Sequence, residues 1–266
     1  FVRLYPTARV LMVTPADLTP ARRRYFAAKC AAAPWDIVVM TREQFTSIPV
    51  SPEVEAQFVE EQIYAYERAL TEAGPNLGNG RTAKRIAKQV MNLRARHQKL
   101  LHRKEDTGLV FDQLGIDFVM VDEIHYYKNL YTPTRMEGFS LPASKRAEHL
   151  YMVTGWLRQR NPNGRCLAGF TGTPLSNTLA EGHVWMRLFL PPWRLEQLGL
   201  PSFDAFAGQF IQYETRIEVK PDGSGFRAHR RPYKFHNRPE LRLIFAEFAD
   251  IRTRESLGIT GPRPQY

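Results

Sequence analysis

Two acidic residues directly follow a run of apolar residues near the middle of the chain. Asp122 and Glu123 come after Val119–Val121, and His125 stands two positions further on. In open α/β sheets, ligands bind outside the carboxyl ends of the strands. A carboxylate at such an end can hold, through water, the Mg²⁺ that bridges the phosphates of ATP, and a second carboxylate can deprotonate the attacking water. The pattern therefore predicts Asp122 as the metal-binding carboxylate and Glu123 as the general base. The alternative is a solvated strand end.

A second polar segment follows the next predicted strand of this region. It runs from Gly169 to Asn177 and contains Thr171, Gly172 and Thr173. Glycine and small hydroxyl residues allow the backbone to turn tightly. The two threonines could hydrogen-bond the acidic loop next door, and His125 is suited to contact them. Such contacts would link the nucleotide state to a nucleic-acid surface. The alternative is an ordinary strand-to-helix turn.

The order of these motifs resembles that of superfamily-two helicases of the DEAD/DEAH type. Thr14-Pro15 comes first, Asp122–His125 second and Thr171–Asn177 third. The third segment is most similar to the Swi/Snf-related branch. Closer still is a group of very large helicases of phages, plasmids and mobile elements, often joined to an adenine-specific DNA methylase. The segments that carry this closer likeness are residues 44–49, 111–130 and 203–257.

The resemblance implies one RecA-like lobe that binds ATP and Mg²⁺ and grips a strand of DNA. Thr14 and Pro15 match the first strand-gripping motif, and Thr41 and Arg42 match the next. Lys128 is a further candidate contact, although a solvated surface charge remains the alternative for Arg42 and Lys128. Such residues would bind phosphates and position the strand without reading its sequence. The implied partners are DNA, a second RecA-like lobe and a fused methylase domain.

The chain departs from the family pattern in two respects. Ile124 stands where the family usually has alanine, and the phosphate-loop pattern G-x-x-x-x-G-K-[ST] does not occur. Gly78–Thr82 lacks the lysine and the spacing of that loop. In the family the phosphate loop lies upstream of residues such as 1–14, so the sequence is expected to be a fragment that is inactive alone. A non-catalytic DNA-binding or regulatory module and a metal-dependent nuclease using Asp122 and Glu123 stay open as alternatives.

Alternating strand and helix patterns are expected to position these residues. Apolar runs at 9–14, 36–40, 117–121 and 165–170 are separated by helical segments, which predicts a three-layer α/β fold with a parallel sheet. We assign residues 1–50 and 105–192 to the RecA-like lobe, with its phosphate loop missing. Residues 193–266 form an α+β extension, in which a turn at 221–225 predicts a β-hairpin.

Residues 51–104 differ from the rest and predict an antiparallel helical hairpin inserted into the lobe. The apolar spacing alternates between three and four, as in a coiled-coil seam that includes Leu70 and His97, with a glycine-rich turn at 74–80. The first helix (51–73) has six acidic residues and one arginine, and the second (81–104) has nine Lys or Arg and no acid. The helices either neutralise each other or present a basic arm to DNA.

Composition limits the class of protein. The 266 residues have a formal net charge of +10 and a pI near 9.7, which suits a polyanionic partner such as nucleic acid. No apolar run approaches the roughly 18 residues that a membrane span needs, so no membrane partner is predicted. The two cysteines, Cys30 and Cys166, lack metal-ligand spacing and fit a cytoplasmic setting.

Overall fold

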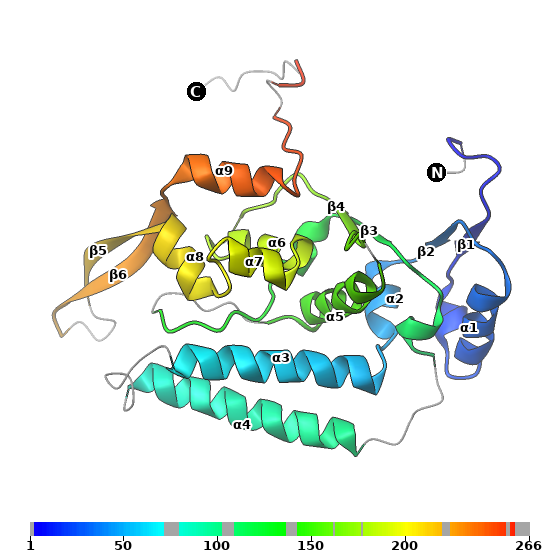
Figure 1. The fold of residues 1–266 in the computed structure, drawn as a ribbon, viewed down its shortest axis with the longest axis horizontal. Coiled ribbons are helices and arrows are strands. Elements are labelled where there is room, and N and C mark those ends of the chain that lie inside the picture. The colour runs from blue at the N-terminus through cyan, green and yellow to red at the C-terminus, as the bar shows by residue number, and fades with distance from the viewer. Residues whose placement is uncertain are drawn as a thin grey trace.

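Over the residues that the structure describes, the protein has a mixed α/β fold with three separate two-stranded sheets, shown in Figure 1. In the computed structural model, the described residues are 3–71, 80–102, 109–136, 143–161, 163–176, 178–219, 224–253 and 256–258. The β5–β6 hairpin lies at one end of the molecule, and α1 with the β1–β2 pair lies at the other (Figure 1).

Two of the sheets are pairs of parallel strands. β1 (Val10–Met12) pairs with β2 (Ile37–Val39), and β3 (Val119–Asp122) pairs with β4 (Leu167–Phe170). Parallel neighbours need a crossover connection, which is usually helical. The helices in these crossovers are η1 (Pro15–Leu18) with α1 (Arg23–Ala32), and η4 (Ile124–Tyr127) with α5 (Lys145–Arg160).

The single RecA-like parallel sheet that we predicted is not seen over the described residues. The structure has two small parallel sheets in its place, and their strands are three or four residues long. The strands end sooner than the apolar runs suggested, because the flanking residues turn into loops or short helices. Met12 and Met120 on these strands are exposed, so neither sheet is covered on both faces as in a doubly wound fold.

The helical hairpin is present as α3 (Pro52–Thr71) and α4 (Arg81–Leu101), which lie side by side in Figure 1. Arg94 pairs with Glu67 at 2.5 Å, and Arg96 pairs with Glu55 at 2.6 Å, so charges are neutralised between the helices. The predicted seam was partly wrong, because Leu70 is 37% exposed. The helix α3 contacts α5 as well as α4, which turns its buried face away from an ideal two-helix seam. Of the predicted turn, residues 74–79 lie outside the described residues.

The helix α5 packs against α2 (Arg42–Ser47), α3 and η4 in the main core. Its Leu150 and Val153 side chains are fully buried. The core also holds Ile124 of η4, so burial of apolar surface fixes the loop that follows β3.

A second apolar cluster organises the C-terminal part. It joins α6, α7, α8, the start of β5 and α9, and its most buried members include Phe206 and Phe210. The strands β5 and β6 form the predicted antiparallel hairpin, although residues 221–223 of its turn lie outside the described residues. The remaining elements are η3 (Phe111–Gln113), α6 (Glu181–Phe189), α7 (Pro192–Gln197), α8 (Phe203–Phe210), β5 (Ile211–Val219), β6 (Phe226–Phe235) and α9 (Arg238–Ala246).

None of the described helices combines the length and the apolar character that crossing a bilayer requires.

Candidate functional site

The acidic loop and the threonine loop begin at the same edge of the β3–β4 sheet. Asp122, the last residue of β3, is aligned with Phe170, the last residue of β4. Because the two strands are parallel, the segments that follow β3 and β4 leave the sheet in the same direction. Glu123 and Thr171, the next residue on each strand, therefore start neighbouring loops.

Glu123 adopts a left-handed backbone conformation, with φ 53° and ψ 50°. This conformation is uncommon for residues other than glycine and tends to occur at functional sites. The turn carries the Glu123 side chain out of the sheet, where it is 53% exposed. The Asp122 carboxylate accepts a 3.0 Å hydrogen bond from the Glu123 amide through Oδ1. Both carboxylates therefore stand at the open end of β3.

His125 connects the two loops. Its Nδ1 lies 3.1 Å from the Thr171 hydroxyl oxygen and 3.0 Å from Oε2 of Glu123. A protonated Nδ1 donates to Glu123 or Thr171, whereas an unprotonated Nδ1 accepts from the Thr171 hydroxyl, so the tautomer decides the direction. The Thr171 hydroxyl also accepts a 3.1 Å hydrogen bond from the Thr173 amide. Gly172, between the two threonines, is exposed.

The isoleucine in the acidic loop is matched by a glycine on the neighbouring strand. A Cβ added at Gly169 would overlap Cδ1 of Ile124 and lie 3.0 Å from its Cγ2. Ile124 is 2% exposed, so it cannot swing into solvent without losing its buried apolar contacts. The departure from alanine at position 124 is therefore accommodated on β4.

Lys128 is buried and does not fit the surface contact with DNA that we expected. Lys128 is only 7% exposed. Its Nζ atom lies 3.2 Å from Oε1 of Glu181, which is fully buried. The ammonium also hydrogen-bonds the Ser176 hydroxyl. Glu181 in turn accepts hydrogen bonds from the backbone amides of Ser176 at 2.8 Å and Thr178 at 3.3 Å. The lysine thus fastens the loop after β3 to the loop after β4.

The residues of the β1–β2 edge that we expected to grip a DNA strand lie at two helix starts. Thr14 caps η1, and its hydroxyl donates a 2.6 Å hydrogen bond to the Asp17 carboxylate, which lowers the pKa of Asp17. Thr41 caps α2, and its hydroxyl accepts a 3.2 Å hydrogen bond from the Gln44 amide. Pro15 is exposed beside Thr14. The Gln44 side chain donates to the Val13 carbonyl at 3.1 Å, so it ties the two strand ends together.

Arg42 packs on the aromatic side chain that follows His125. The Arg42 guanidinium carbon lies 3.7 Å from the centre of the Tyr126 ring, and that of Arg146 lies 5.7 Å from it. Hydrogen bonding to Tyr126 raises the pKa of Arg42 above its usual value. Sequence analysis did not single out Tyr126 or Glu181 as site residues. The only signals were that Tyr126 falls in the family-like segment 111–130 and that Glu181 is a strong helix-capping residue type.

Metal-binding capacity at the site is modest. The described residues contain no group of three or more His, Cys, Asp or Glu side chains that could hold a metal ion. The Asp122–Glu123 pair fits the weaker demand of Mg²⁺ held largely by nucleotide phosphates and water, which needs one or two carboxylates.

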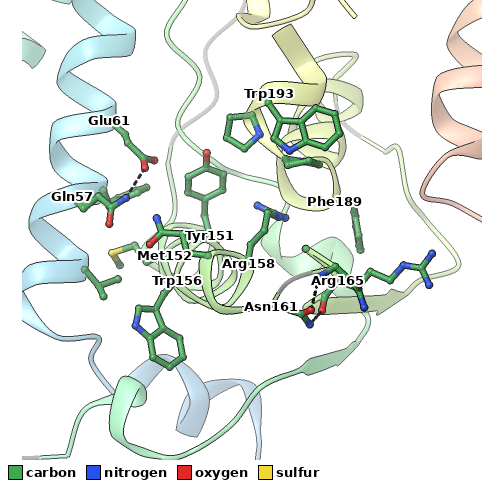
Figure 2. Close-up of a pocket in the computed structure, with 18 residues that line it drawn as sticks. Gln57, Glu61, Tyr151, Met152, Trp156, Arg158, Asn161, Arg165, Phe189 and Trp193 are labelled. Atoms are coloured by element: carbon green, nitrogen blue, oxygen red, sulfur yellow. Dashed lines mark hydrogen bonds between the residues drawn. The ribbon is translucent and has the colours of Figure 1, made fainter. Parts of the chain in front are cut away.

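One cavity among the described residues lies away from these motifs. It has a volume of 560 Å³ and is bounded by α3, α5 and the start of α7 (Figure 2). Tyr151, Arg158 and Trp193 face it, with Gln57 and Glu61 on the opposite wall (Figure 2). None of the motif residues lines this cavity.

The comparisons with known proteins define the class of this chain. Residues 1–253 match the family described as "Probable helicase domain", and the chain belongs to that family. It is also similar to Defense against restriction protein B of Escherichia phage P1, with 26% identity over 241 residues. That match covers 86% of this chain and 10% of the relative, so the chain spans about a tenth of the length of the relative. No solved structure matches this chain.

Proposed function

We propose that this chain is the nucleotide-hydrolysing lobe of an ATP-dependent DNA helicase or translocase with a RecA-like organisation. The observation that carries the proposal is the contact between the two strand-end loops, where His125 lies 3.1 Å from Thr171 and 3.0 Å from Glu123. Membership of the helicase-domain family supports the same reading. The net charge of +10 suits DNA as the partner.

The residues at the end of β3 have the chemistry that hydrolysis requires. MgATP, when bound, would supply the phosphoanhydride bond and the metal charge on the phosphates. Asp122 would hold the metal through water, since its side chain is exposed at the strand end. Glu123 would orient the attacking water and take its proton.

The loop after β4 would report the nucleotide state to the DNA-binding side. Thr171 bonds both His125 and the backbone of Thr173, so a shift of His125 is transmitted into this loop. Thr14, Pro15, Thr41 and Arg42 would contact DNA phosphates at the β1–β2 edge. Lys128 is assigned a structural role and not a DNA contact, because it is buried against Glu181.

The relative suggests a setting for the intact protein. The name of this phage protein describes defence against restriction. We propose that the intact protein acts on DNA of a mobile element, together with a second RecA-like lobe and a fused methylase domain.

The decisive experiment is the substitution Glu123→Gln in the intact protein. Phosphate release from MgATP, measured with and without DNA, should fall to background, while binding of a fluorescent ATP analogue stays within about twofold of the unaltered protein. Glu60→Gln, an exposed glutamate on α3, is the matched control and should turn over normally. Normal turnover in Glu123→Gln would remove this residue from its role. An unaltered protein that binds DNA but never hydrolyses ATP would favour the non-catalytic module.

A further inference from the structure

Tyr126 lies between the nucleotide-facing loop and the strand-gripping residue Arg42. Its ring is 4.4 Å from the His125 ring, at an interplanar angle of 30°. The Arg42 guanidinium carbon lies 3.7 Å from the centre of the same ring. Tyr126 itself is 43% exposed. Tyr126 therefore contacts residues of both motifs.

These contacts form a continuous path between the two sheets. The path starts at Thr171 after β4, passes through His125 and Tyr126 in η4, and ends at Arg42 in the first turn of α2 after β2. Two other contacts among the described residues stay within one sheet: Lys128–Glu181 at the β3–β4 edge and Gln44–Val13 at the β1–β2 edge. A displacement of the His125 loop would therefore reach the β1–β2 edge through Tyr126.

Arg42 has hydrogen-bonding capacity that this packing leaves unused. Its Nη1 atom is enclosed and makes no hydrogen bond with the described residues. A guanidinium gains most from paired acceptor oxygens, such as those of a phosphate. Binding of a DNA phosphate would therefore compete with packing on Tyr126, and a phosphate-bound position of Arg42 would be the second of the two states that coupling requires.

We infer that Tyr126 couples the nucleotide state of the loop after β3 to the grip of Arg42 on a DNA phosphate, an inference that rests on the proposed function. When nucleotide moves His125, the Tyr126 ring moves with it and either retains or releases the guanidinium. A tyrosine that only packs would stabilise the protein and would affect DNA binding equally with and without nucleotide. The coupling must therefore be measured as a ratio of DNA affinities.

The experiment measures the dissociation constant of a labelled single-stranded oligonucleotide for the intact protein by fluorescence anisotropy. Each protein is measured with and without a non-hydrolysable ATP analogue plus Mg²⁺, and the ratio of the two constants is the coupling. In the unaltered protein the ratio should differ from one by about threefold or more, in line with the strength of a cation–π contact. Tyr126→Ala should bring the ratio to within about 1.5-fold of one.

Two further variants separate the aromatic ring of Tyr126 from its apolar bulk, and a third variant is a control. Tyr126→Phe keeps the aromatic face and should retain most of the ratio, whereas Tyr126→Leu keeps apolar bulk alone and should lose it. Both are mild enough at a half-exposed position to keep the fold if Tyr126→Ala does not. Tyr64→Ala, at an exposed tyrosine on α3, is the control and should leave the ratio unchanged.

The outcomes distinguish this inference from the proposed function. A ratio of one in the unaltered protein, a normal ratio in Tyr126→Leu or a lost ratio in Tyr126→Phe each overturns the coupling, even if ATP is hydrolysed. If Glu123→Gln turns over ATP normally, the proposed hydrolytic role fails. The coupling would still stand in that case if the ratio is present and Tyr126→Leu removes it.

Discussion

The two parallel strand pairs present motif residues at their carboxyl ends, but they hold them differently. At the β3–β4 edge the bonds join residues far apart in the chain: His125 to Thr171, and Lys128 to Ser176 and Glu181. At the β1–β2 edge the threonine hydroxyls bond residues only three positions away, Thr14 to Asp17 and Thr41 to Gln44. The first edge is fastened by tertiary contacts and the second mainly by local helix caps.

This difference suits the two tasks that we assign to the edges. Hydrolysis depends on fixed positions, because small misplacements of reacting groups are costly. A buried ion pair and a long-range hydrogen bond provide such fixing at the β3–β4 edge. Contacts to a phosphate backbone tolerate exposed and locally held residues, since phosphates repeat along the strand. Breaking the two sets of bonds should therefore lower the stability of the protein by different amounts and disturb different parts of the structure.

The largest effect is expected from Lys128→Met. The substitution keeps much of the side-chain volume but leaves the fully buried Glu181 carboxylate without its cation. Removing one partner of a buried pair typically costs about 3–5 kcal/mol. The free energy of unfolding, measured by guanidinium denaturation, should fall by that order.

Two variants test whether the loss of stability comes from removing the Lys128 cation beside the buried Glu181 carboxylate. The double substitution Lys128→Met with Glu181→Gln should recover part of the stability, because it removes the buried charge and the single oxygen of the new amide can still accept one of the two backbone hydrogen bonds, from Ser176 or from Thr178. Lys88→Met, at an exposed lysine on α4, should be nearly neutral. Equal losses at positions 128 and 88 would mean that the pair does not fasten the edge.

Gly169→Ala is expected to lower the free energy of unfolding by an intermediate amount. The new Cβ would overlap the buried Ile124 side chain, and overpacking of this kind costs about 1–3 kcal/mol. Gly155→Ala on α5 is the control: nothing lies within 4 Å of its added Cβ, so it should stabilise by about 0.5–1 kcal/mol. Thermal unfolding of both variants gives the comparison.

A rescue variant identifies the clash. Ile124→Ala with Gly169→Ala should be more stable than the sum of the single losses predicts, since the two changes act on one contact. Strict additivity would show that Ile124 and Gly169 do not constrain each other, and that the isoleucine is accommodated elsewhere.

The sequence predicted the local parts of this structure better than the long-range ones. The strand runs, the helical hairpin and the β-hairpin follow from periodicity and turn residues, which act over short distances. The adjacency of Asp122 and Thr171 followed from the rule that parallel strands end at one edge. The fastening of that edge by Lys128 and Glu181 could not be predicted, because it depends on how α6 is placed after folding.

Two errors have the same physical origin. Lys128 was a candidate DNA contact from the family resemblance, with a solvated surface charge as the alternative, but it is buried and a carboxylate from α6 compensates its charge. Leu70 was placed on a two-helix seam, but α3 also packs on α5 and so turns that residue outward. In both cases a third element, invisible to local patterns, decides the environment of the side chain.

The smallest effect is expected from Thr41→Ala at the β1–β2 edge. The hydroxyl caps α2 through the Gln44 amide, and loss of such a cap costs about 1 kcal/mol. Thr41→Ser keeps the hydroxyl and should be close to the unaltered protein. Native-state hydrogen exchange should show faster exchange in the first turn of α2 and unchanged protection of the β3–β4 strands. A loss of protection that spreads to β3 and β4 would contradict the contrast between the edges, because it would mean that the local cap supports the long-range contacts as well.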